Sequence, residues 1–363
     1  MPRPAAPPRP PVARLAAAVL VAAGACLALA SPTLANDSSA AFGVGGLVFT
    51  RNPAVAMRSE DLFLSAGEVR VRYVFENTSD ADVTGLVAFP LPDIAVPSYE
   101  ENIAWPEPAG GRAIDFTTVV DGVPVETATE ERVFALNLDR TEWLARLNVP
   151  LEPQRRETLE ATDALPRAEW DDLVAVGLAR IEEYDDDGKG MRDHLVPAWT
   201  YRVTYYWTQT FPAGAKTVVE HRYRPAVGLS LGTLLGNPAY AAEDWAKQQI
   251  ADTERRYCAD KGFLAAAAKA VKAAEAKKGY LQEVRLDYIL TTGANWAGAI
   301  GTFRLVVDKG APGNLVSFCG EGVKKIGPTT FEMTKTDFVP TADLSVLILT
   351  EDFNALLGLP PAP

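Results

Sequence analysis

One short motif contains residue types that could hydrolyse a substrate. The segment GLSLG at residues 228–232 matches G-x-S-x-G, in which a tight strand-to-helix turn exposes a serine nucleophile. That fold places its histidine after the serine, whereas the two histidines, His194 and His221, both precede Ser230. Another order of a catalytic triad is geometrically possible. A hydrolase that uses Ser230 and His221 therefore stays open, although a small-residue connection ahead of a helix is the simpler interpretation.

An acidic segment could bind a hard cation. Glu183, Asp185, Asp187 and Gly188 correspond to positions 1, 3, 5 and 6 of a calcium-binding loop. The twelfth position, which needs a bidentate glutamate in an EF-hand, holds His194 instead. The sequence leaves two interpretations, a weak Ca²⁺ site and a solvated acidic turn.

Aromatic side chains could form a platform for a sugar or a peptide, because Tyr and Trp combine a large apolar area with a polar tip. The densest aromatic group falls at residues 201–211. Alternation along a strand places Tyr205 and Trp207 on one face and Tyr206 on the other, which makes Tyr206 the better candidate for an exposed contact. Trp296 is a second candidate, with a packing anchor at a strand end as its alternative.

Other chemistries lack support. The sequence has no H-E-x-x-H motif, phosphate-binding P-loop or dinucleotide fingerprint, so no cofactor other than Ca²⁺ is indicated. The formal net charge is −12, which is unsuited to a phosphate backbone, so we expect no nucleic-acid partner. The 363 residues, 48% hydrophobic and 23% charged, are typical of a folded chain of one large domain or two.

Residues 1–35 have the pattern of a secretory signal peptide. Arginines precede an apolar run at residues 15–30, and a small-residue cleavage site follows at residues 33–35. We expect cleavage before Asn36 and a periplasmic or extracellular mature protein. A membrane anchor is the alternative, but the run is shorter than the ~20 residues that span a bilayer, and no later segment approaches that length. Lipid attachment at Cys26 is a further alternative, although the usual leucine three positions upstream is missing.

The two remaining cysteines, Cys258 and Cys319, predict a disulfide, since an even pair in an oxidising compartment usually joins. Closing this loop would stabilise the folded chain by roughly 4 kcal/mol on the chain-entropy model. A redox pair usually has the C-x-x-C spacing and a structural zinc site needs four ligands, so those two functions fit less well.

Several segments alternate with the period of two that half-buried strands require. Residues 69–76 and 83–91 predict a hairpin with a turn at 76–80. Residues 201–207 and 219–223 predict two more strands with a turn at 211–214. His221 lies in the last of these, where a satisfied, half-buried histidine is more common than a general base.

Helical periodicity occupies residues 141–184 and again about 239–278. Short strands follow between residues 283 and 350. We therefore expect a mainly β (α+β) fold. An antiparallel, sandwich-like N-terminal domain at 36–225, with a helical insertion at about 137–198, precedes a helical segment and a smaller C-terminal β region at 226–363.

Motifs along nearly all of the mature chain resemble the DUF4424 family of exported bacterial proteins. The N-terminal motifs are Asn36–Ala40, Gly45–Leu47, Glu60–Leu62 and Phe89–Pro92. The later motifs are Tyr206–Gln209, Phe211–Gly214, Glu220–Tyr223, Asp287–Leu290, Asn295–Gly298 and Leu315–Cys319. The resemblance implies export, but the family is named for an unknown function and lends no catalytic residues.

A fainter similarity joins Tyr73–Asn77, Phe89–Pro92 and Asp121–Val125 to the vault/inter-alpha-trypsin (VIT) domain, an extracellular β module. It covers only about residues 65–135. Such modules often precede a von Willebrand A domain with a D-x-S-x-S metal motif, and this sequence contains no such motif. The likeness therefore implies a β module and no particular partner.

Together these patterns predict an exported, non-catalytic β-rich protein that binds a protein or another component of the cell envelope. A calcium-stabilised structural envelope protein is one alternative. A secreted hydrolase with a non-standard site is the other.

Overall fold

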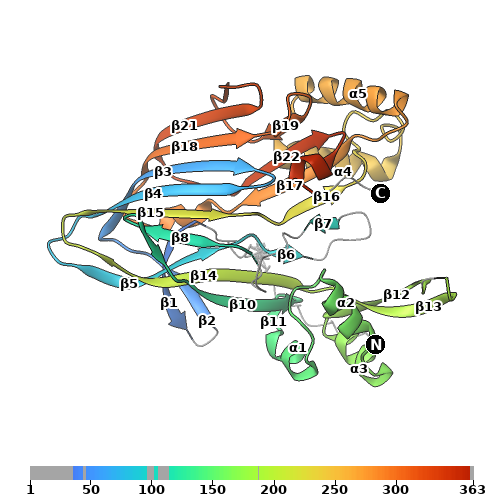
Figure 1. The fold of residues 1–363 in the computed structure, drawn as a ribbon, viewed down its shortest axis with the longest axis horizontal. Coiled ribbons are helices and arrows are strands. Elements are labelled where there is room, and N and C mark those ends of the chain that lie inside the picture. The colour runs from blue at the N-terminus through green and yellow to red at the C-terminus, as the bar shows by residue number, and fades with distance from the viewer. Residues whose placement is uncertain (1–35, 44–45, 96–101, 105–113, 187, 360–363) are drawn as a thin grey trace, which may run out of the picture. The chain divides into compact units, whose positions relative to one another are not determined.

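The computed structural model describes residues 36–43, 46–95, 102–104, 114–186 and 188–359. In this part of the chain the fold is mainly β with helical insertions, as the sequence predicted (Figure 1). Within the described residues, no helix is both long enough and apolar enough to cross a membrane.

The first large sheet, sheet A, has the strand order β11-β10-β14-β5-β1-β2, with β6 also paired to β14. Every pairing in it is antiparallel. Its strands are β1 (Ser38–Gly43), β2 (Gly46–Thr50), β5 (Val83–Pro90), β6 (Ile94–Ala95), β10 (Ala128–Ala135), β11 (Leu138–Asp139) and β14 (Thr200–Phe211).

The second large sheet, sheet B, has the order β20-β21-β18-β3-β4-β15-β8-β9. Its strands are β3 (Val55–Ser65), β4 (Val69–Asn77), β8 (Thr117–Val120), β9 (Val123–Val125), β15 (Lys216–Tyr223), β18 (Ile300–Asp308), β20 (Lys324–Lys325) and β21 (Thr330–Phe338). Strand β18 pairs in parallel with β3, so strands from both sides of residue 225 belong to one sheet.

The apolar faces of sheets A and B pack against each other as a sandwich. Phe75 on β4 lies 5.7 Å, between ring centroids, from Phe211 on β14. Phe89 on β5 lies 4.9 Å from the ring of His221 on β15. Alternate residues of each strand therefore reach the core, and each fully buried aromatic side chain contributes roughly 1.5–3 kcal/mol. The period of two read from the sequence is the direct cause of this layer structure.

The predicted hairpin of residues 69–76 and 83–91 is wrong in its pairing, although both strands are present. β4 pairs with β3 and β15, whereas β5 pairs with β14 and β1, so the turn between β4 and β5 crosses from sheet B to sheet A. The turn after β14 crosses back in the same way, to β15. Alternation cannot distinguish a hairpin from such a crossing, because both connect strands with one buried face.

The helical insertion is shorter than its apolar pattern predicted. It contains α1 (Thr141–Leu147), α2 (Arg156–Asp163) and α3 (Arg167–Ala175), followed by a hairpin of β12 (Ala179–Asp185) and β13 (Met191–Pro197). Helix α3 stops because Gly177 adopts a φ of +78° and the amide of Leu178 donates to the carbonyl of Leu173, as in a Schellman cap. The helical prediction to residue 184 is therefore wrong after this glycine.

A third sheet, sheet C, has the order β19-β22-β17-β16-β7 and contacts the longest helices. Its strands are β7 (Asn102–Ala104), β16 (Val227–Ser230), β17 (Gln282–Tyr288), β19 (Leu315–Phe318) and β22 (Leu344–Thr350). The remaining elements are α4 (Asp244–Tyr257), α5 (Lys261–Ala276), the 3₁₀ helix η1 (Thr291–Asn295) and α6 (Phe353–Leu357). Cys258 and Cys319 form the predicted disulfide, with their Cα atoms 5.0 Å apart, and join the end of α4 to the segment after β19.

Candidate functional site

A pocket of about 260 Å³ lies where sheet C meets the end of β5. Six parts of the chain line it: the segment from Leu91 through β6, strand β7, Ile114 ahead of β8, the segment from the end of β15 into β16, the last turn of α4, and β17. Several chain segments that converge on one mostly apolar cavity are the usual setting of a small-molecule site.

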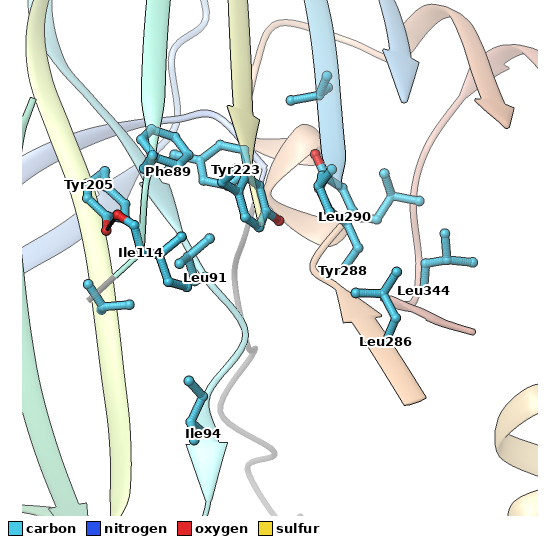
Figure 2. Close-up of a cluster of buried hydrophobic side chains, with 14 of the residues drawn as sticks. Phe89, Leu91, Ile94, Ile114, Tyr205, Tyr223, Leu286, Tyr288, Leu290 and Leu344 are labelled. Atoms are coloured by element: carbon cyan, nitrogen blue, oxygen red, sulfur yellow. Dashed lines mark hydrogen bonds between the residues drawn. The ribbon is translucent and has the colours of Figure 1, made fainter. Parts of the chain in front are cut away.

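One wall of the pocket is apolar and belongs to the core. Leu91, Ile94 and Ile114 are buried; Leu91 lies near Ile114 and Tyr223, and Ile94 lies farther along the chain, on β6 (Figure 2). The Tyr205 hydroxyl donates to the carbonyl of Ile114 at 3.0 Å and holds this segment against β14. The wall is thus fixed by packing and by a buried hydrogen bond.

The opposite wall carries polar groups from the last turn of α4. Arg256 and Tyr257 both line the pocket. Tyr257 is buried, and its hydroxyl has no hydrogen-bond partner among the described residues. The helix ends directly after it, because Cys258 takes a left-handed φ of 51° and bonds to Cys319. The disulfide therefore fixes the turn that presents both side chains.

Strand β17 supplies the charged groups beside that turn. Arg256 Nη2 donates to both carboxylate oxygens of Asp287, at 3.0 and 2.8 Å. Arg285 donates to Glu283 Oε2 through Nε and Nη2, at 2.9 and 2.6 Å. Burial raises the pKa of Glu283 to about 7, against the opposing effect of a hydrogen bond from Thr233, and lowers the pKa of Arg285, against the opposing charge of Asp287. Arg256 and Arg285 both line the cavity, and so does Asp287, the carboxylate that pairs with Arg256.

A second, more open groove of about 530 Å³ lies over sheet B. Its arginines are matched by acids on the same face. Arg72 lies 3.4 Å from Glu220, and Arg304 lies 3.1 Å from Asp61. Because these pairs are exposed and mutually neutralised, the groove offers a weaker recognition surface than the less open pocket beside sheet C.

The two residues of the hydrolase hypothesis have other hydrogen-bond partners. The Ser230 hydroxyl donates to the carbonyl of Gly232 at 2.8 Å. His221 is buried, with Nε2 at 3.0 Å from Asp37 Oδ1 and Nδ1 at 3.0 Å from Thr118 Oγ1. No hydrogen bond joins Ser230 to His221 in the described parts of the chain.

The two aromatic binding candidates occupy different environments. Tyr206 is half-buried and contacts Phe42 edge-to-face at 5.5 Å between centroids. Trp296 is only 4% exposed, donates to the carbonyl of Asp37 at 2.5 Å and packs on Phe75 at 4.6 Å. Of the two, Tyr206 alone presents appreciable surface to a partner.

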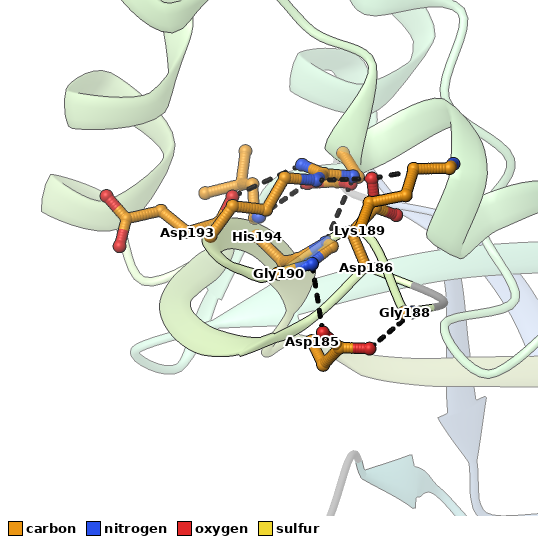
Figure 3. A network of polar contacts seen from close by, with 10 residues as sticks. Asp185, Asp186, Gly188, Lys189, Gly190, Asp193 and His194 are labelled. Carbon is orange, nitrogen blue, oxygen red and sulfur yellow. Dashed lines mark hydrogen bonds and ion pairs between the residues drawn. The ribbon is translucent and has the colours of Figure 1, made fainter.

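The predicted calcium residues lie in the β12–β13 hairpin (Figure 3). The carboxylate of Asp185 accepts hydrogen bonds from the backbone amides of Gly188 and Gly190. Glu183 sits opposite Asp193 in the hairpin register, and Asp187 lies outside the described residues. In the residues that the structure describes, no three His, Cys, Asp or Glu side chains gather in a way that could hold a metal ion.

The base of the same hairpin is held by Asp163, at the end of α2. Its carboxylate accepts from the Leu195 amide at 2.9 Å and from Arg192 at 2.8 Å, and its Oδ2 lies 3.0 Å from His194 Nδ1. The His194 ring stacks on Tyr184 at 3.6 Å between centroids. His194 therefore has a structural role, because its contact with Asp163 ties the β12–β13 hairpin to helix α2.

The fold and this site define a β-sandwich protein with a partly open pocket of about 260 Å³. The chain belongs to the family of the domain of unknown function DUF4424, whose model matches residues 35–347. No curated protein matches the chain. One solved structure, of a Legionella pneumophila protein provisionally described as a nutrient-binding protein, is 15% identical with a TM-score of 0.39 and covers 87% of this chain and 70% of that one.

The family match confirms the resemblance read from the motifs, and the likeness to the VIT domain stays a prediction. The pocket residues were missed by the sequence reasoning. Arg256 and Arg285 are far apart in the chain and share no motif. The one signal in the sequence that could have pointed to Arg256 and Tyr257 was Cys258, because its predicted disulfide indicates that the helix end next to it is held in place.

Proposed function

We propose that this protein is an exported, non-catalytic binding protein of the cell envelope, whose ligand occupies the pocket between α4, β17 and the end of β5. The observation that carries the proposal is the pocket itself, with an apolar wall opposite Arg256 and Tyr257. Export is supported by the leader pattern of residues 1–35 and by a disulfide, which persists in an oxidising compartment.

The lining indicates the chemistry of the ligand. Leu91, Ile94 and Ile114 suit an apolar body, and the guanidinium of Arg256 with the Tyr257 hydroxyl suits a head group that accepts hydrogen bonds. At about 260 Å³ the cavity is smaller than the roughly 300–1,000 Å³ of sites for drug-sized molecules. A small amphipathic carboxylic acid matches both the size and the polarity.

The test is calorimetric titration of the mature protein with octanoate, compared with 1-octanol, which has the same chain length without the carboxylate. We expect octanoate to bind with a Kd of roughly 6 mM or tighter, since about ten non-hydrogen atoms at ~0.3 kcal/mol each supply ~3 kcal/mol or more. Octanol should bind more weakly. Saturating octanoate should also raise Tm.

Two variants locate the site. Tyr257→Phe removes only the unpartnered hydroxyl and should weaken octanoate binding about fivefold, the loss of ~1 kcal/mol expected for one hydrogen bond. Arg256→Gln should weaken it further. Arg255→Gln is the matched control, since Arg255 precedes Arg256 in α4 and pairs with Asp252 on the exposed side. Equal affinities in all four proteins, or no binding of octanoate to any of them, would refute the proposal.

A further inference from the structure

The first residues that the structure describes are fully buried among polar groups. Asn36, Asp37 and Ser38 each have 0% exposure. Asn36 Nδ2 donates to Glu60 Oε2 at 2.9 Å, and the Tyr73 hydroxyl donates to Asn36 Oδ1. Burial of a chain start in this way is unusual, because terminal residues are commonly ordered only when something ties them down.

The polar contacts leave this cluster short of positive charge. Asp37 and Glu60 are both buried, and Asp37 Oδ2 and Glu60 Oε1 have no hydrogen-bond partner among the described residues. His221 is the one basic side chain that pairs with either acid in the described parts of the chain. Burial raises the pKa of Glu60 to about 8, as expected for a carboxylate without a cation. Because an unpaired buried carboxylate costs several kcal/mol, Glu60 with this pKa binds a proton near neutral pH, and one further cation beside it would let it ionise as part of an ion pair.

We propose that cleavage of the Ala35–Asn36 bond supplies that cation, as the α-ammonium group of Asn36, which pairs with Glu60 and Asp37. In the cleavage, water adds across the peptide bond, so Ala35 leaves with a carboxylate and Asn36 gains an amino group. That group binds a proton at neutral pH, because the pKa of an α-amine is about 7.7–8.0 before any carboxylate raises it. The amide present before cleavage is neutral and donates one hydrogen bond at most.

The geometry of Asn36 supports this pairing. Its side-chain amide already contacts Glu60, and its backbone nitrogen lies only a few covalent bonds away in the same buried residue. Asn295 and Trp296 hold the next two residues, through Ser38 Oγ at 2.9 Å and the Asp37 carbonyl at 2.5 Å. Asn36 is therefore held by its own side chain and through the two residues that follow it, and removal of the leader should stabilise the sandwich core.

The inference rests on the export proposed above, and its test separates the two. Intact-mass analysis of the protein from its own host shows whether the mature chain begins at Asn36. Independently, a chain released at Asn36 by a site-specific protease is compared with a chain that keeps one extra residue, Ala35. A mature chain that begins at another residue contradicts the proposed processing site. Equal properties of the two chain starts contradict the proposed pairing of the α-ammonium group. Neither result depends on octanoate binding.

Two readouts carry the second comparison. Removal of the extra residue should raise Tm by roughly 5 °C, and this gain should vanish in Glu60→Gln but persist in Glu76→Gln, a half-buried glutamate on β4 that pairs with Arg58 outside the cluster. In the unaltered mature chain, the α-amine should react with an amine-labelling reagent at least about tenfold more slowly than in the unfolded chain. Equal Tm values for the two chain starts, or an α-amine that labels as fast as surface lysines, would overturn the inference.

Discussion

Reduction of the Cys258–Cys319 disulfide should both destabilise the protein and loosen its pocket. The bond closes a loop with a sequence separation of 61 residues. On the chain-entropy model, opening such a loop costs about 4 kcal/mol at 25 °C. The unfolding entropy for a chain of this length is about 0.7 kcal/mol per kelvin, so Tm should fall by about 6 °C.

The functional effect follows from the position of the bond. Cys258 is the residue after Tyr257, and the disulfide is the covalent link between the end of α4 and the segment after β19. Without it, Arg256 and Tyr257 lose a fixed backbone. Octanoate binding should weaken roughly three- to tenfold, which is the loss of about one well-placed hydrogen bond.

The assay compares the oxidised mature protein with a Cys258→Ser/Cys319→Ser double variant by scanning calorimetry and by octanoate titration. The same protein treated with a phosphine reductant provides a second measurement, with free thiols counted to show that the bond is open. An unchanged Tm in fully reduced protein would refute the stability argument. An unchanged octanoate affinity at a lowered Tm would refute the link between the disulfide and the pocket.

Three further predictions concern other parts of the chain. Burial alone would raise the pKa of Asp163, but a hydrogen bond from the Leu195 amide and the neighbouring cations hold this pKa below its ordinary value. The stabilisation that results is complete above about pH 4 and is lost as the pH falls through the lower pKa of the folded state. Asp163→Asn should therefore flatten the acid limb of a plot of stability against pH. Trp296→Ala should cost about 3–5 kcal/mol in chemical denaturation, and Tyr206→Ala less than about 1.5 kcal/mol, because the first is buried and the second only half-buried; comparable losses would contradict the burial argument. If the β12–β13 hairpin binds Ca²⁺, calcium should raise the Tm of the protein, and Asp185→Asn should abolish that rise. If Asp185 only closes the loop by accepting hydrogen bonds from backbone amides, Asp185→Asn should lower stability slightly and by the same amount with and without calcium.

The strands of the sandwich could be predicted from the sequence because burial on one face enforces alternation. Tyr205 and Trp207 were expected on the same face of one strand, and both are at most 4% exposed. Which strands pair could not be predicted. The turns after β4 and β14 have ordinary turn residues, and only the tertiary structure decides whether a chain returns beside itself or crosses to the other sheet.

The candidate site was harder to predict than the fold. Its residues come from several separate segments, and its charged residues Arg256 and Arg285 lie in no motif, since a pocket of this kind depends on shape and a few converging polar groups. The burial of Asn36 was equally hidden. Nothing in its sequence context distinguishes a buried chain start from an exposed one, and the cluster around it combines residues far apart in the chain.

Calorimetric titration of octanoate into the mature protein and into Arg256→Gln, with Arg255→Gln as control, tests the central claim most directly. The account predicts binding to the unaltered protein and to the control with equal affinity, and a loss of about tenfold or more in Arg256→Gln, the range for a hydrogen bond to a charged group. Equal binding to all three proteins would place the ligand elsewhere. No heat of binding to the unaltered protein would contradict the claim that this pocket takes a small amphipathic acid.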